Sequence, residues 1–252
     1  MTSETSRDSV RSVERALLIL QCYTLDTSSL TLMEISRKMD LPMSTTVRIV
    51  STLQKMGFLD RNDDKSYSLG SRTYSIGCVA RAHFRLQKVA YPFMVQIRDA
   101  TKEAVSLYGI EGESRVCYEH VPSLLSMRCV VRPGDHFQLW AGASGKCLLA
   151  YSSAEIVERE MAKAHSITAT TIVDRKRFLA NLGEIRELGY AISYGEREEG
   201  ITSIAVPIFY PRGEATACLS VAGPSVRFTD DVIRDLLPWI TRLAADITKR
   251  VS

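Results

Sequence analysis

One short segment of the chain presents hydroxyl and cationic side chains with no carboxylate among them. Apolar residues at helical spacing predict a helix over residues 43–56: Ile49, Val50, Leu53 and Met56. The opposite face of this helix carries only polar residues: Ser44, Thr45, Arg48, Ser51, Thr52 and Lys55. Hydroxyls and free N–H groups near a helix N-terminus donate to phosphate oxygens, and an arginine binds guanine through two hydrogen bonds. We therefore predict that this helix reads double-stranded DNA.

A second short helix is expected directly before this one. Thr31 and Glu34 have the spacing of a capping box, in which each residue's side chain accepts a hydrogen bond from the other's backbone N–H. Pro42 disfavours helical geometry at Leu41, so the helix ends there. Two short helices joined by a tight turn are typical of a helix-turn-helix.

A hairpin is expected after the DNA-reading helix. Two short strand-like runs, residues 58–59 and 67–69, flank a polar turn. Arg61 and Lys65 on this hairpin are expected to contact the DNA backbone beside the groove. We therefore predict a winged helix-turn-helix DNA-binding domain over residues 1–71. The alternative is a small helical domain with an ordinary solvated face, which the order of these parts disfavours.

Composition and charge agree with this division. The 252 residues suffice for two domains, and 45% hydrophobic residues suffice for their cores. Up to Lys88 the chain has 13 Lys and Arg against 9 Asp and Glu, whereas the remainder has 19 against 20. The basic surplus therefore lies in the N-terminal part of the chain, which contains the predicted DNA-binding domain and the start of the linker. Its modest size favours two or more copies acting together on DNA.

Cysteine usage and hydropathy indicate the cellular compartment of the protein. The six cysteines form no C-x-x-C pair, which favours reduced thiols over disulfides or a zinc site. The N-terminal residues are polar, and no apolar run reaches the length of a membrane span. We therefore expect a cytoplasmic protein with no membrane partner.

The rest of the chain predicts a linker and a second domain. A helical pattern over residues 72–90 predicts a linker helix, which Pro92 is expected to break or restart. Beyond it, strands are expected at residues 105–108, 116–121, 127–131, 204–210 and 218–221, the last two joined by a turn at 211–213. Helices are expected from a capping box at Ser152-Ser153-Ala154-Glu155, from Asp174 and at the C-terminal end. This pattern predicts an α+β protein whose second domain, residues 91–252, is an antiparallel sheet covered by helices.

One glycine-containing loop in this second domain resembles a phosphate-binding P-loop at first sight. Residues 141–147 fail that pattern, because Trp140 stands where glycine is needed and Cys147 where a metal-binding hydroxyl is needed. The loop still leads into a helix whose first N–H groups would suit a carboxylate. The alternative is that its small residues only allow close packing.

No catalytic or metal-binding cluster is evident. The run Glu196-Arg197-Glu198-Glu199 offers paired carboxylates, but a charged run between two strands is more often a solvated loop. The four histidines are isolated along the chain and form no Ser/His/Asp, Cys/His or metal-ligand spacing. We therefore expect no enzyme activity, no metal and no cofactor.

Nine short segments are spread in order over almost the whole length of the chain: SVERAL (12–17), LPMSTTVR (41–48), GFL (57–59), YSLG (67–70), GASGK (142–146), RELGY (186–190), EGI (199–201), IAVP (204–207) and LSVAGP (219–224). In these segments and their order the chain resembles the IclR family of bacterial transcriptional regulators. The resemblance implies a homodimer or homotetramer on operator DNA, frequently as a repressor. It also implies a GAF-like C-terminal domain that binds a small organic effector.

The resemblance also points to effector-binding residues. In such regulators the ligand lies against the loop before the Gly-Lys helix and the facing strands. By position this implies the backbone groups of Ala143 and Ser144 and the side chains of Ser193, Ser203 and Ser220. Ser193 and Ser203 stand where glyoxylate-responsive relatives have an acid and a cysteine, and a serine is replaced by Ala222.

These departures bear on the class of effector. Fewer polar anchors, together with Phe137, Leu139 and Trp140 near the loop, favour an aromatic or other apolar carboxylic acid over a two-carbon acid. We therefore include Trp140 among the expected effector-binding residues. One rival interpretation is a body that hydrolyses its own effector, and another is an architectural DNA-binding protein without an effector. The choice between repressor and activator, and between dimer and tetramer, stays open.

Overall fold

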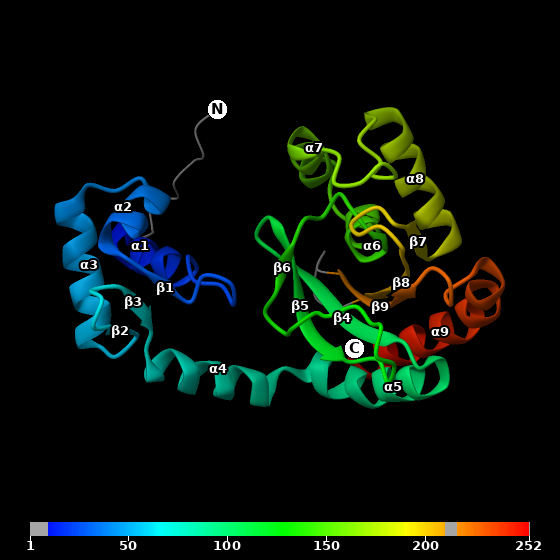
Figure 1. Ribbon diagram of the computed structural model, residues 1–252, viewed down its shortest axis with the longest axis horizontal. Helices are drawn as coiled ribbons and strands as arrows, with labels where there is room; N and C mark the ends of the chain where they lie inside the picture. Colours follow the sequence, from blue (N-terminus) through cyan, green and yellow to red (C-terminus); the bar gives the residue numbers. More distant parts are fainter. Residues whose placement is uncertain (1–9, 210–215, 252) are drawn as a thin grey trace. The chain divides into compact units, whose positions relative to one another are not determined.

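The computed structural model describes residues 10–209 and 216–251 and divides the chain into two compact units, residues 1–84 and 85–252. The first unit contains, in order, α1 (Arg11–Leu20), β1 (Ser29–Leu30), α2 (Leu32–Met39), α3 (Met43–Lys55), β2 (Leu59–Arg61), β3 (Tyr67–Leu69) and α4 (Ser71–His83) (Figure 1). Its three strands form an antiparallel sheet in the order β1-β3-β2. This arrangement is the winged helix-turn-helix that the sequence predicts.

Local sequence explains where the helices of this unit begin and end. The Thr31 N–H donates to a Glu34 carboxylate oxygen at 2.8 Å, and the Glu34 N–H donates to the Thr31 hydroxyl at 3.3 Å, so the expected capping box is present. Helix α2 ends at Asp40, whose φ of 47° is left-handed. Buried residues from α1 and the turn after it, α2, α3 and the sheet form one core: Ile19, Tyr23, Leu30, Ile35, Val50, Leu53, Leu59 and Tyr67.

The second unit is built on a six-stranded antiparallel sheet in the order β6-β5-β4-β9-β8-β7. Its elements are α5 (Arg85–Thr101), β4 (Ala104–Glu111), β5 (Ser114–Val121), β6 (His136–Phe137), α6 (Ala143–Ala150), α7 (Ala154–Lys163), α8 (Arg175–Leu188), β7 (Ala191–Tyr194), β8 (Ile201–Phe209), β9 (Thr216–Pro224) and α9 (Asp230–Val251). Helices α5 and α9 cover one face of the sheet, and α6 with α8 covers the other (Figure 1). The predicted antiparallel sheet covered by helices is therefore confirmed.

Two expectations about elements are wrong. The expected linker helix over residues 72–90 is two helices separated at Phe84, and the second one continues through Pro92 instead of breaking there. Leu86, Ala90 and Met94 are buried along one face of α5, and this packing outweighs the hydrogen bond that Pro92 removes on the exposed face.

Residues 127–131, expected to form a strand, are irregular, although Cys129 and Val131 within them are buried. Apolar residues alone indicate burial and do not distinguish a strand from a packed loop. The turn expected at residues 211–213 lies outside the described residues. No helix in the described ranges has the length and apolar character needed to cross a bilayer.

Candidate DNA-binding surface and effector cavity

Helix α3 presents most of the residues predicted to read DNA on its solvent face. Ser44, Arg48, Ser51, Thr52 and Lys55 are exposed, and Thr45 is half-buried. The first turn of α3 contains no acidic residue and has no side-chain cap, so the N–H groups of Met43 and Ser44 are open to an anion, whereas that of Thr45 donates to the Pro42 carbonyl oxygen at 3.0 Å. Within the described part of the chain, neither Arg48 nor Lys55 forms an ion pair with a carboxylate.

The wing carries the two remaining predicted residues. Arg61 lies at the end of β2 and Lys65 in the turn of the hairpin, and both side chains are exposed. The turn is ordered by the Asp64 carboxylate, which accepts from the Ser66 N–H at 2.9 Å, while Lys65 adopts a left-handed φ of 66°. Helix and wing therefore both present cations to solvent within the same compact unit.

The second unit encloses a small cavity between its sheet and the first turn of α6. The cavity has a volume of about 40 Å³. Five of the predicted effector-binding residues line it: Ala143, Ser144, Ser193, Ser203 and Ser220. The sixth, Trp140, does not line it, because its indole packs in the hydrophobic core and donates to the His165 carbonyl oxygen at 3.3 Å. Leu139 is likewise buried in that core.

A buried arginine, which sequence reasoning missed, also lines the cavity. Arg115 lies on β5 with 2% of its surface exposed, and one terminal nitrogen donates to the Ser144 hydroxyl. Its guanidinium carbon lies 4.7 Å from the ring centre of Tyr108 and 5.0 Å from that of Phe137. Its Nε has no hydrogen-bond partner, and no carboxylate in the described residues forms an ion pair with it. Burial lowers the pKa of Arg115 to about 10, because the environment disfavours the charged form.

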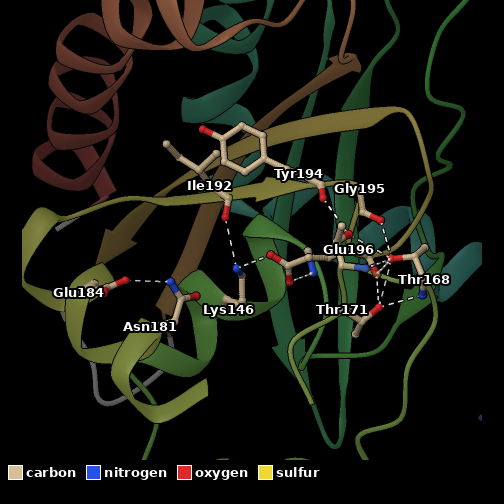
Figure 2. Close-up of polar contacts among 11 residues, drawn as sticks. Lys146, Thr168, Thr171, Asn181, Glu184, Ile192, Tyr194, Gly195 and Glu196 are labelled. Atoms are coloured by element: carbon tan, nitrogen blue, oxygen red, sulfur yellow. Dashed lines mark hydrogen bonds and ion pairs between the residues drawn. The ribbon is translucent and has the colours of Figure 1, made fainter. Parts of the chain in front are cut away.

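Next to the cavity, a lysine and a glutamate form a buried ion pair. The Lys146 Nζ lies 2.5 Å from a Glu196 carboxylate oxygen and also donates to the Ile192 carbonyl oxygen at 3.2 Å (Figure 2). The other Glu196 oxygen accepts from the Gly142 N–H at 3.4 Å. Lys146 is therefore neutralised and does not line the cavity. The expectation that residues 196–199 form only a solvated loop is wrong for Glu196, which is 5% exposed.

Threonine hydroxyls hold the loop that follows β7. Thr168 donates to the Gly195 carbonyl oxygen at 2.7 Å, and Thr171 donates to the Glu196 carbonyl oxygen at 2.7 Å (Figure 2). Thr170 donates to the Tyr194 carbonyl oxygen at 2.8 Å. Three hydroxyls thus fix the backbone from which the next residue, Arg197, reaches the cavity.

A histidine and a serine complete one side of the cavity. The Ser106 hydroxyl lies 2.9 Å from His120 Nδ1, and both residues line the cavity. Burial lowers the pKa of His120, an effect that nearby Glu119 and Asp135 oppose and Arg128 reinforces. Register explains this contact, since Ser106 and His120 are directly paired across β4 and β5.

Comparisons with known proteins agree with this architecture. The family model described as bacterial transcriptional regulator IclR C-terminal matches residues 78–249, and the IclR helix-turn-helix domain model matches residues 12–63. KipR of Bacillus subtilis, an HTH-type transcriptional regulator, is 29% identical over 96% of this chain and 96% of its own. BhcR of Paracoccus denitrificans, with the same description, is 30% identical over 88% of this chain and 80% of its own.

A solved structure supports the same assignment for the fold. A crystal structure described as a putative IclR transcriptional regulator from Silicibacter sp. TM1040 matches with a TM-score of 0.89 and 26% identity, covering 95% of this chain and 96% of that one. Family models, sequence relatives and fold therefore agree over both units. The chain belongs to the IclR family and is a DNA-binding transcriptional regulator, not an enzyme.

Proposed function

We propose that a small carboxylic acid binds in the cavity of the second unit and changes the affinity of this regulator for its operator. The observation that supports this is Arg115, a buried guanidinium that lines the cavity and has no carboxylate partner among the described residues. A buried charge without a partner is costly. A carboxylate fits a guanidinium through two parallel hydrogen bonds, so an acid would remove that cost.

The other anchors would be hydroxyl and backbone groups already at the cavity. The side chains of Ser144, Ser193, Ser203 and Ser220 line it. The N–H groups of Ala143 and Ser144 belong to the first turn of α6, where backbone donors have no acceptor within the helix. These donors favour an anionic ligand over a cationic one.

The size of the cavity favours a compact acid over the aromatic one that the sequence suggests. A volume of about 40 Å³ corresponds to roughly three to four water-sized spaces. An IclR homologue from Microbacterium hydrocarbonoxydans is complexed with 4-hydroxybenzoate, but at 24% identity it shares only the fold with this chain. The aromatic class stays a prediction and belongs in any ligand panel.

On the DNA side, we propose that α3 enters the major groove and that the wing contacts the adjacent backbone. The contacts would come from Ser44, Thr45, Arg48, Ser51, Thr52, Lys55, Arg61 and Lys65. The modest charge surplus of the N-terminal part of the chain favours a homodimer or homotetramer on the operator. The location proposed for this regulator is the cytoplasm.

Thermal unfolding against a panel of acids tests the effector proposal. The panel runs from glyoxylate and pyruvate to benzoate and 4-hydroxybenzoate. An acid at ~100 times its dissociation constant adds about 2.7 kcal/mol to the free energy of unfolding of the wild type. We expect Arg115→Met to lose this response without losing ligand-free stability, because methionine removes an unpaired buried charge.

Arg234→Met is the matched control, since Arg234 is exposed on α9 and does not line the cavity. It should keep the full response. A response to acids that Arg115→Met leaves intact would contradict the proposed anchor. No response to any acid in the panel would contradict the proposed effector class.

A further inference from the structure

A second arginine reaches the same cavity, and it lies over the same aromatic ring as Arg115. The Arg197 guanidinium carbon lies 4.5 Å from the ring centre of Phe137, and that of Arg115 lies 5.0 Å from the same centre. Both arginines line the cavity. Phe137 thus brings two cations to one small space and supplies no negative charge to either.

The acidic residues of the cavity do not neutralise this pair. Glu196 is engaged by Lys146 at 2.5 Å. Glu198 also lines the cavity, but it is exposed and forms no ion pair with Arg115 or Arg197 in the described residues. Water screens an exposed carboxylate, so its charge offsets the buried guanidinium only weakly.

Hydrogen bonds from threonine side chains hold the backbone directly before the second arginine, Arg197. The Gly195 and Glu196 carbonyl oxygens accept hydrogen bonds from Thr168 and Thr171 (Figure 2). The Glu196 side chain is fixed by Lys146. The residue that follows, Arg197, therefore starts from an ordered backbone. Its charge also contributes to lowering the pKa of Arg115, which indicates that the two guanidinium groups repel each other.

We propose that the effector is a short-chain dicarboxylate, with one carboxylate on Arg115 and Ser144 and the other on Arg197. This inference rests on the proposed function and names the ligand class of the same cavity. A monocarboxylate neutralises one guanidinium and leaves the other without a partner. Two carboxylates neutralise both and remove the repulsion between them. The serine hydroxyls favour the same class, because a diacid presents four oxygens to them.

Binding of matched acids to the full-length protein tests this inference. Malonate is compared with propionate, and succinate with butyrate, because each pair has the same number of carbons and differs by one carboxylate. Isothermal titration calorimetry at fixed ionic strength should give the wild type about tenfold or greater preference for each diacid. Arg197→Gln should remove most of that preference, because it lowers the affinity for each diacid far more than the affinity for the matching monoacid.

The control and the adverse outcomes separate this inference from the effector proposal. Arg234→Gln, which changes an exposed arginine outside the cavity, should keep the diacid preference. Equal binding of diacid and monoacid, or a preference that survives Arg197→Gln, would overturn the dicarboxylate inference and leave the effector proposal standing. If acids bind and Arg115→Met does not weaken their binding, the effector proposal fails as well. If none of the four acids binds, the inference that the effector is a short-chain dicarboxylate is overturned.

Discussion

Two long cationic side chains are buried in the second unit, and they differ in whether a carboxylate accompanies them. Lys146 is 1% exposed and pairs with Glu196, which is 5% exposed. Arg115 is 2% exposed, contacts a hydroxyl and two aromatic rings, and forms no ion pair with a carboxylate of the described residues. A paired buried charge contributes to structure, whereas a buried charge without a partner is expensive and marks a binding site. The contrast supports a structural role for Lys146 and the proposed ligand-binding role for Arg115.

The buried pair gives a prediction about stability. Lys146→Met should lower the free energy of unfolding by about 3–5 kcal/mol, because it leaves the Glu196 carboxylate buried without its partner. Adding Glu196→Gln to that variant should recover most of the loss, since no net charge then remains. Urea unfolding of the single and double variants measures both values. A double variant as unstable as the single one would show that shape, and not charge, is responsible.

At this scale the sequence predicts some cavity residues and misses others. Ser144, Ser193, Ser203 and Ser220 were placed by their positions in family-like segments, and they do line the cavity. Arg115 carries no such signal, because an arginine at the start of a strand is usually solvated. Arg197 was hidden in a charged run. Whether either arginine is paired depends on contacts between distant segments, which one sequence does not reveal.

Among the elements, α6 is positioned by a glycine that touches another backbone. A Cβ built on Gly145 would lie 2.3 Å from the Leu139 carbonyl oxygen, far inside any real contact. The loop of residues 139–142 therefore lies directly against the first turn of α6. This contact supports the sequence alternative that these small residues allow close packing, and the anion-binding interpretation of the same turn stays a prediction.

This contact predicts opposite effects at two helical glycines. Gly145→Ala should destabilise the protein by about 1–3 kcal/mol, because a backbone carbonyl cannot move aside cheaply. Gly183→Ala on α8 should stabilise it by about 0.5–1 kcal/mol, because nothing lies within 4 Å of the added Cβ and alanine favours helix. Denaturant midpoints of the two variants provide the test. Destabilisation at both sites would show that the effect is general to glycine and not specific to the Leu139 contact.

Element boundaries follow burial more closely than local breaking signals. The proline at residue 92 was expected to break a helix, yet α5 continues through it because its buried face packs on the sheet and α9. The break lies instead at Phe84, whose ψ of 87° is outside the helical range. Capping residues were more reliable guides, since the hydroxyl of Thr31 and the carboxylate of Asp174 both accept the expected backbone hydrogen bonds. A cap acts over one turn, whereas the effect of a proline depends on distant packing.

For the whole molecule, the division at Phe84 means that each unit has a core of its own. Ile35 is fully buried in the first unit, and Ile97 is fully buried in the second. The expected boundaries, a DNA-binding domain over residues 1–71 and an effector domain from residue 91, were drawn from pattern changes. The contacts instead assign α4 to the first unit and all of α5 to the second.

Separate cores predict separate unfolding transitions in the full-length chain. Ile35→Ala should lower the midpoint temperature of one calorimetric transition, and Ile97→Ala should lower that of the other. Each variant should lower the free energy of unfolding of its own unit by about 2–5 kcal/mol, because each removes buried methyl groups from one core. A cavity ligand should raise only the transition that Ile97→Ala lowers, since the cavity belongs entirely to the second unit. If both variants shift one common transition, the two cores unfold as a single cooperative unit. In that case a ligand bound in the second unit would also stabilise the DNA-binding unit, because the two units would unfold together.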